Sequence, residues 1–127
     1  MLTVEIISFS FKKGYPAAND NGGGFVFDCR FLNNPGRYPE YRDKTGKDRE
    51  VKEFLHHHST IDKFLINVWE ILDEAVEVYM ERGFTSLQVA FGCTGGQHRS
   101  VFCAEETARH LLENYPAIGV NLIHRER

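Results

Sequence analysis

Residues 87–100 read LQVAFGCTGGQHRS, and this stretch decides how the rest of the chain is interpreted. Its first five residues are typical of a buried strand, the glycines favour a turn, and apolar residues at helical spacing begin near His98. Such an arrangement aims several main-chain N–H groups at one point, where the helix N-terminus adds about half a positive charge. The stretch therefore predicts an anion-binding loop that suits a phosphate group.

The side chains of this loop favour the same interpretation. Gly95 and Gly96 can adopt backbone angles closed to other residues, which lets an anion approach the main chain. Arg99 offers a planar fork that matches phosphate oxygens. The candidate ligand residues of the loop are Thr94, Gly95, Gly96, Gln97, His98, Arg99 and Ser100. The alternative is an ordinary strand-to-helix turn, in which the glycines serve packing and the polar residues cap the helix.

Two standard nucleotide-binding fingerprints do not match the loop. A Walker A sequence requires Gly-Lys at the place where this chain has Gln97-His98. Thr94 occupies the position of the second glycine in the dinucleotide-binding pattern. The loop therefore predicts phosphate binding without either of these nucleotide folds.

An enzyme signature does match the same residues. Cys93, Arg99 and Ser100 fit the Cys-x5-Arg-Ser pattern of cysteine-dependent phosphatases, in which a thiolate attacks phosphorus. A helix N-terminus and a nearby cation favour such a nucleophile. Gly92 stands where those phosphatases usually carry His. The alternative is that Cys93 is a small buried residue beside a ligand.

The composition indicates one domain of ordinary globular character. The chain has 127 residues, 42% of them apolar, and a formal net charge of -3, so no overall basic field attracts nucleic acid or a membrane. Its three cysteines form no disulfide framework, which suits a reducing compartment. Neither a signal peptide nor a membrane-spanning apolar stretch is expected. We expect a soluble cytoplasmic protein without a membrane partner.

The remaining elements predict an α/β domain with a largely parallel sheet and crossover helices. Strands are expected at residues 2–9, 25–29 and 119–124, short and long helices after residues 48 and 59, and a long loop at residues 30–47. Ser59 and Asp62 suggest a capping box for the longer helix, and Gly83 ends it. Ligands of such sheets bind outside the carboxyl ends of the strands.

Other polar residues are expected near that crevice. Asp28 ends a strand and could accept hydrogen bonds from a sugar hydroxyl or amine, or it caps its own loop. Lys12 could reach an anion, although exposed lysines are usually only solvated. Consecutive helical residues such as His56–His58 point about 100° apart and cannot share one metal ion. We expect neither a metal nor a cofactor.

Four stretches of the chain carry a family resemblance. They read SFSFK at residues 8–12, FDCRFLNNP at residues 27–35, TGKD at residues 45–48 and GCTGGQHRS at residues 92–100. In order and spacing they resemble the C-terminal domain of the RapZ family of RNase adapter proteins, from about residue 8 to residue 125.

The resemblance implies a bacterial phosphosugar-binding domain over residues 1–127, with features of a phosphofructokinase subdomain. It implies binding of glucosamine 6-phosphate and of small regulatory RNA, and assembly into homo-oligomers. Carried over by motif, the loop holds the phosphate, and Asp28, Arg30 and Lys12 face the sugar or line the pocket. The sequence departs from the family pattern in three ways: it contains no N-terminal P-loop nucleotide-binding domain, its basic tail is reduced to residues 124–127, and Gly36 and Arg37 follow Asn-Pro where the family often has His.

Three functional hypotheses follow from the sequence. The first is a non-catalytic sensor of a small phosphorylated metabolite, and the second is a phosphatase that uses Cys93 and Arg99. The third is an RNA-binding module. Its basic residues are Lys12, Lys13, Arg37, Arg42, Arg125 and Arg127.

Overall fold

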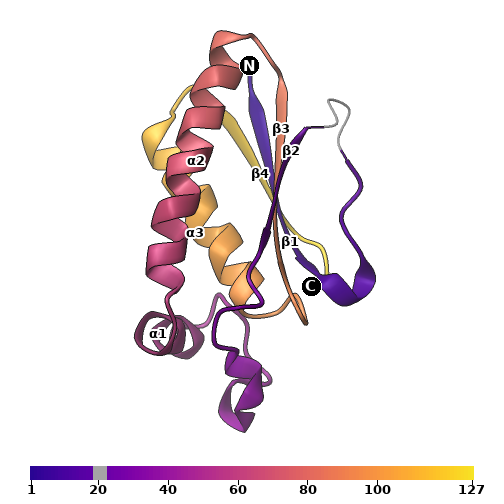
Figure 1. The fold of residues 1–127 in the computed structure, drawn as a ribbon, viewed down its shortest axis with the longest axis vertical. Coiled ribbons are helices and arrows are strands. Elements are labelled where there is room, and N and C mark those ends of the chain that lie inside the picture. The colour runs from indigo at the N-terminus through magenta and orange to yellow at the C-terminus, as the bar shows by residue number, and fades with distance from the viewer. Residues whose placement is uncertain (19–22) are drawn as a thin grey trace.

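The computed structural model describes residues 1–18 and 23–127. Within these residues, four parallel strands form one sheet in the order β2-β3-β1-β4 (Figure 1). The strands are β1 (Thr3–Ser10), β2 (Gly24–Asp28), β3 (Ser86–Cys93) and β4 (Gly119–His124). The helices are α1 (Arg49–His58), α2 (Ile61–Glu81) and α3 (Arg99–Asn114). The predicted single α/β domain is confirmed, and its described sheet is entirely parallel.

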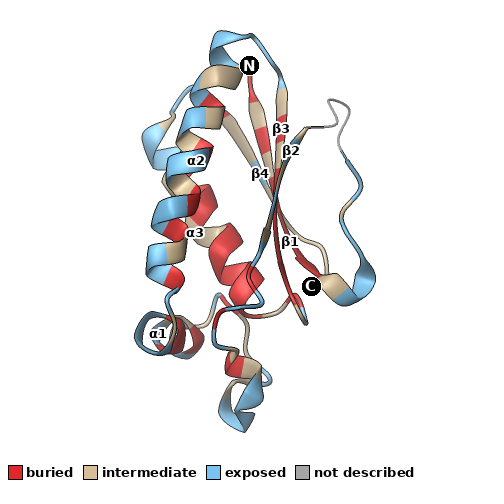
Figure 2. Ribbon diagram, in the orientation of Figure 1, coloured by how far each residue is buried: buried red, intermediate tan, exposed pale blue. Residues whose placement is uncertain are grey.

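The long helices α2 and α3 cover one face of the sheet (Figure 1). In α2 the buried residues recur at helical spacing at Ile61, Leu65, Val68, Leu72 and Val76, which places one apolar stripe against the core. Figure 2 shows buried residues concentrated on α3 and on the halves of β1 and β3 that lead to their carboxyl ends. The most continuous burial therefore lies toward the carboxyl ends of β1 and β3.

The opposite face of the sheet has a smaller apolar cluster. Ile7, Phe9 and Ala90 are buried there, and Phe11 and Ile123 pack against them. The segment that follows β1 runs along this side (Figure 1). Because β1 and β3 are covered on both faces, their burial is nearly continuous, as expected for central parallel strands.

The predicted loop at residues 30–47 contains two 3₁₀ turns, Pro35–Arg37 and Pro39–Tyr41. Each has Pro at one of its first positions, and the side chain of Asn34 accepts a hydrogen bond from the Gly36 N–H. These local proline and asparagine preferences give the loop regular turns without a longer helix.

The helix boundaries test two smaller predictions. Gly83 follows α2 with φ +72°, which confirms its role in ending the helix. The predicted capping box of Ser59 and Asp62 at the start of α2 is wrong. Thr60 precedes α2, the Ser59 hydroxyl accepts the Ile61 N–H, and the Asp62 carboxylate pairs with His56 at 2.7 Å. Asp62 does not cap α2 because the last turn of α1 places the His56 ring within hydrogen-bond distance of its carboxylate. None of the helices in the described residues combines the length and apolar character needed to cross a bilayer.

Candidate functional site

The anion loop, residues 94–100, leaves the carboxyl end of β3 and enters α3. Its path is held at both sides of the turn: the Ser10 hydroxyl donates to the Thr94 carbonyl at 2.6 Å, and Gly96 has φ +65°. A Cβ on Gly96 would lie 2.7 Å from Cγ of Glu126, so this position requires glycine. Gly95 is exposed, with nothing within 4 Å of the place a Cβ would take. The turn therefore has one packed side and one open side.

The main-chain amides of residues 95–101 have no hydrogen-bond partner in the part of the chain that the structure describes. Among the described residues, none of the N–H groups of residues 95–101 donates a hydrogen bond, and the first helical bond runs from the Phe102 N–H to the His98 carbonyl. The first amides of α3 lack partners because no helical turn precedes them. Together with the positive end of the α3 dipole, these donors form an arrangement that favours a bound anion.

Arg99 is almost fully buried at the start of α3, with 3% of its surface exposed. Its Nη1 donates to the carbonyls of Arg30 and Leu32, both at 2.9 Å, which ties the segment after β2 to α3. Its Nε is buried and has no hydrogen-bond partner among the described residues. A buried charged donor without a partner is costly, which makes this nitrogen a candidate for binding an anion.

Two predicted ligand side chains bind protein carbonyls. Gln97 Nε2 donates to the carbonyls of Arg42 and Lys44, each at 2.7 Å. His98 Nε2 lies 2.8 Å from the Tyr41 carbonyl, which can only accept, so this nitrogen carries a proton. Burial lowers the pKa of His98, which favours the neutral ring at pH 7. These side chains brace residues 41–46, hereafter the shared segment, against the loop.

The shared segment fits the loop through a glycine. The Gly46 N–H donates to the Gln97 carbonyl at 3.0 Å. A Cβ at Gly46 would lie 2.5 Å from the Phe102 nitrogen and in conflict with the His98 carbonyl. Gly46 belongs to the sequence stretch at residues 45–48, and this close approach of two main chains explains why glycine stands there.

Asp28 and Arg30 form a pair at the carboxyl end of β2. Arg30 Nη2 and Nε donate to the Asp28 carboxylate at 2.6 and 2.9 Å, and the Arg30 N–H donates to it as well. Those hydrogen bonds hold the pKa of Asp28 below its ordinary value. The Arg30 guanidinium also lies over the Phe11 ring, 3.9 Å from its centre. Asp28 thus caps its own loop.

Lys12 lies in the 3₁₀ turn Phe11–Lys13 that follows β1. Its side chain is exposed and makes no ion pair with another residue of the described ranges, so it is available to a ligand. Its N–H donates to the Ser10 hydroxyl, which in turn donates to Thr94. Ser10 therefore connects the two segments that carry Lys12 and the anion loop.

The cysteine of the phosphatase signature is buried. Cys93 ends β3 with 2% of its surface exposed, and its Sγ donates to the Ser100 hydroxyl at 3.1 Å. The Sγ atoms of Cys29 and Cys103, both buried, lie 3.9 Å apart. Burial raises the pKa of the Cys103 thiol, which keeps it protonated and unreactive.

No group of three potential metal ligands is arranged for a metal ion within residues 1–18 and 23–127.

Sequence reasoning missed three residues of the site: Ser10, Gly46 and Glu126. Glu126 Oε2 accepts the Ser10 N–H at 2.8 Å and Arg125 Nη2 at 2.8 Å, directly beside Gly96. Burial alone would raise the pKa of Glu126, but these two donors outweigh it and lower the pKa. Ser10 and Gly46 lie in stretches already singled out by the resemblance, whereas no sequence pattern marked Glu126.

The comparison with known proteins matches residues 2–127 to the RapZ C-terminal domain. The chain belongs to this family. The match covers nearly the whole chain and confirms the resemblance found in its sequence. The loop with its free amides lies inside the matched residues.

Bacterial relatives of this RapZ C-terminal domain carry the name nucleotide-binding protein. The chain is 46% identical over 123 residues to one from Fervidobacterium nodosum, 40% over 126 residues to one from Thermotoga neapolitana and 40% over 124 residues to one from Lactobacillus helveticus. These matches cover 97%, 99% and 98% of the chain. The chain spans about two fifths of those relatives, namely 42%, 42% and 40% of their lengths.

Proposed function

We propose that this domain is a non-catalytic sensor of a small phosphorylated metabolite, of the hexosamine phosphate class, with glucosamine 6-phosphate as the first candidate. Two observations carry the proposal: the amides of residues 95–101 make no hydrogen bond to any residue that the structure describes, and the buried Nε of Arg99 has no such partner either. Main-chain donors at a helix N-terminus bind phosphate without a metal or cofactor. The relatives named nucleotide-binding proteins are consistent with a phosphate ligand.

The sugar end of the ligand would lie toward β2 and the turn after β1. Lys12 is exposed there and pairs with no acidic residue of the described ranges, and Asp28 with Arg30 presents both an acceptor and a donor. An ammonium group on the sugar would pair with the Asp28 carboxylate, whereas a hydroxyl would bind it more weakly. This difference is the basis for preferring an amino sugar over glucose 6-phosphate.

Amide-resolved NMR titration tests the proposal directly. Inorganic phosphate, glucose 6-phosphate and glucosamine 6-phosphate are expected to shift the amide signals of residues 95–101, most strongly for the amino sugar. Replacing Arg99 with Ala should weaken binding by about 1.5–3 kcal/mol, since a charge-assisted bond is lost. Arg109→Ala is the matched control, because Arg109 is exposed and pairs only with Glu106 among the described residues. Unshifted loop amides at millimolar ligand would reject the proposal.

The same samples separate the sensor from the phosphatase. Incubation with a generic aryl phosphate should give no turnover. Turnover that disappears in Cys93→Ser would show instead that the domain is an enzyme, with Cys93 as nucleophile and Ser100 as its hydrogen-bond partner. Sedimentation of these samples tests the homo-oligomer that the family resemblance implies.

RNA binding is the second candidate function, favoured by a group of rings and arginines after β1. Arg30 lies over Phe11, Arg125 lies over Phe9, and the Tyr15 ring meets Phe11 edge-on at 5.7 Å. Exposed tyrosine and arginine planes are surfaces on which unpaired bases stack. Gel-shift titration with single-stranded RNA should show binding that weakens with salt and with Tyr15→Ala. Absence of binding at low salt would eliminate this candidate.

A further inference from the structure

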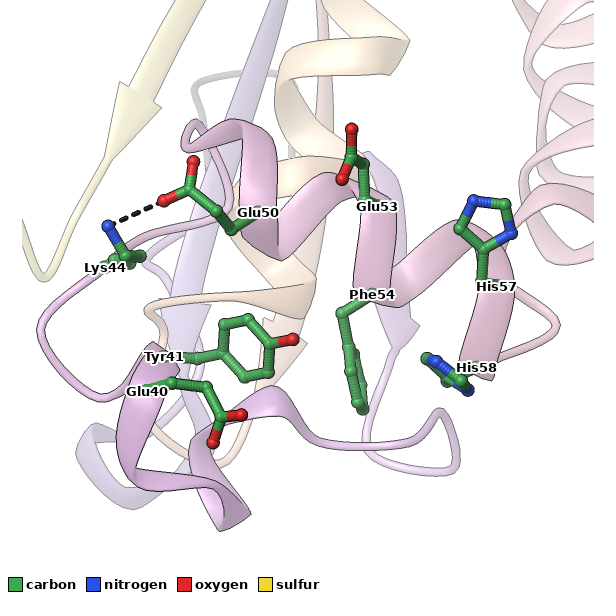
Figure 3. Close-up of a pocket in the computed structure, with 8 residues that line it drawn as sticks. All are labelled: Glu40, Tyr41, Lys44, Glu50, Glu53, Phe54, His57 and His58. Carbon is green, nitrogen blue, oxygen red and sulfur yellow. Dashed lines mark ion pairs between the residues drawn. The ribbon is translucent and has the colours of Figure 1, made fainter.

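A hollow of about 430 Å³ lies on the far side of the shared segment, between the turn Pro39–Tyr41 and α1 (Figure 3). A second hollow of about 350 Å³ adjoins it and shares Glu40, Tyr41, Phe54 and His58. Together they are called the aromatic hollow here. None of the residues predicted to bind phosphate lines either part.

Aromatic rings form the wall of the aromatic hollow. The Phe54 ring lies 5.3 Å from Tyr41 and 5.5 Å from Tyr38, centre to centre, and is itself buried. Tyr41 comes from the turn and Phe54 from α1, so two elements present ring surface to one space (Figure 3). Tyr38, which directly precedes the turn, lines the adjoining part of the hollow. Such electron-rich faces attract a cation, most strongly when it is partly desolvated.

The rim of the aromatic hollow is negatively charged. Glu40, Glu50 and Glu53 line it, and Lys44 is the one Lys or Arg in the lining, with its ammonium 2.6 Å from Glu50 (Figure 3). The Glu40 carboxylate makes no hydrogen bond or ion pair with any residue the structure describes, and the hydroxyls of Tyr38 and Tyr41 make none either. Glu53 pairs with Arg49, which does not line the hollow. The aromatic hollow therefore offers one carboxylate without a partner among the described residues, that of Glu40, beside ring faces, and its lining cation Lys44 is already held by Glu50.

The shared segment connects the aromatic hollow to the anion loop. Its Tyr41 carbonyl is bound by His98, while the Tyr41 ring lines the aromatic hollow. Its Lys44 carbonyl is bound by Gln97, while the Lys44 ammonium lies at the rim. A change in the position of Gln97 or His98 would thus move residues that line the aromatic hollow.

We propose that the aromatic hollow is the docking site for an arginine side chain of a partner protein, and that occupancy of the anion loop changes its affinity. A guanidinium stacks on rings and binds a carboxylate through two parallel hydrogen bonds, which suits the Tyr41 and Phe54 rings beside the free Glu40. A lysine ammonium lacks the planar stacking surface. The docking site stands on its own geometry, and its coupling to the anion loop rests on the proposed function.

Titration of the 127-residue chain with N-acetyl-arginine amide, followed by amide-resolved NMR, tests the docking site. Saturable shifts should be largest in the turn Pro39–Tyr41 and in α1. The matched probe N-acetyl-citrulline amide has nearly the same shape without the charge and should give none. Equal responses to the two probes, or to tetramethylammonium and arginine, would overturn the assignment to arginine.

Two variants keep this test independent of folding. Glu40→Gln should weaken arginine binding on the order of tenfold, because an ionised acceptor is lost at an exposed position. Glu81→Gln at the end of α2 is its matched control and should leave binding unchanged. Tyr38→Leu should weaken binding on the order of threefold by removing one ring face. Unchanged affinity in Glu40→Gln would overturn the proposal.

A final arm measures the coupling. Arginine affinity with and without saturating inorganic phosphate should differ by about twofold or more, as in typical coupled sites. Equal affinities would overturn the coupling. If phosphate leaves the amides of residues 95–101 unshifted, the proposed function fails, and the arginine titration still decides the docking site on its own.

Discussion

The anion loop and the aromatic hollow lie on opposite sides of the shared segment. The loop offers main-chain groups to a ligand, whereas the aromatic hollow offers side chains. In the loop the free donors are main-chain amides, and the side chains of Gln97, His98 and Arg99 are used to hold other segments. In the aromatic hollow the Glu40 carboxylate and the Tyr41 hydroxyl bind no residue that the structure describes, while the Tyr41 ring packs against Phe54 and the Tyr41 carbonyl is bound. A site made of main chain tolerates little added volume, whereas a site made of exposed side chains can change without cost to folding.

The largest expected effect is on folding at the shared segment. Gly46→Ala should lower the free energy of unfolding by about 3 kcal/mol, because a Cβ there conflicts with two main-chain atoms that cannot both move. Urea denaturation measures this. Gly95→Ala, where space is open, is the matched control and should change stability by less than about 0.5 kcal/mol. Similar losses of stability in both variants would contradict the tight packing at Gly46 and the open space at Gly95.

The next effect concerns Arg99. Arg99→Lys should cost about 2 kcal/mol of stability, because an ammonium cannot bond the carbonyls of Arg30 and Leu32 together while filling the guanidinium volume. Lys44→Met in the aromatic hollow breaks an exposed pair and should cost at most about 0.5 kcal/mol. Thermal unfolding of the two variants compares the sites. A larger loss in the Lys44 variant would reverse the contrast between them.

A smaller effect is expected on ligand affinity. Glu126→Gln keeps an acceptor for the Ser10 N–H but removes a negative charge beside Gly96. Phosphate binding should tighten by about three- to tenfold, which corresponds to about 1 kcal/mol of relieved repulsion, and the gain should shrink in high salt. Calorimetry at two salt concentrations measures it, with Glu113→Gln near the other end of α3 as control. Weaker binding in Glu126→Gln would show that this carboxylate supports the loop.

The smallest effect is a pH dependence from His98. Burial lowers its pKa from the ordinary value of 6.5, so just below that pH the unfolded chain binds more protons than the folded protein. The free energy of unfolding should therefore fall as pH drops below 6.5, and the fall should level out below the folded pKa. In His98→Gln the amide can still donate to Tyr41, and this part of the slope, less than about 1 kcal/mol, should vanish. An unchanged slope would contradict a buried neutral ring.

Much of the fold could be predicted because its signals are local. The strand at residues 119–124, the helix that follows the loop and Gly83 at the end of α2 lie where periodicity and glycine placed them. The capping box failed because the Asp62 carboxylate is bound by His56, a residue outside the four-residue motif. Helix-end motifs describe only local bonds, and a side chain six residues away on another helix competes for the same carboxylate.

The sequence by itself determined that a strand passes through a glycine turn into a helix, and hence that unpaired amides collect at one end of a parallel sheet. Backbone geometry within a few residues is enough for that. Only the tertiary structure decided which donors remain free. The carbonyls that occupy Arg99 come from residues 67 and 69 positions away, and those that occupy Gln97 come from residues 53 and 55 positions away. A side chain takes the acceptor that folding brings within reach, and no local pattern in the sequence reports that distance.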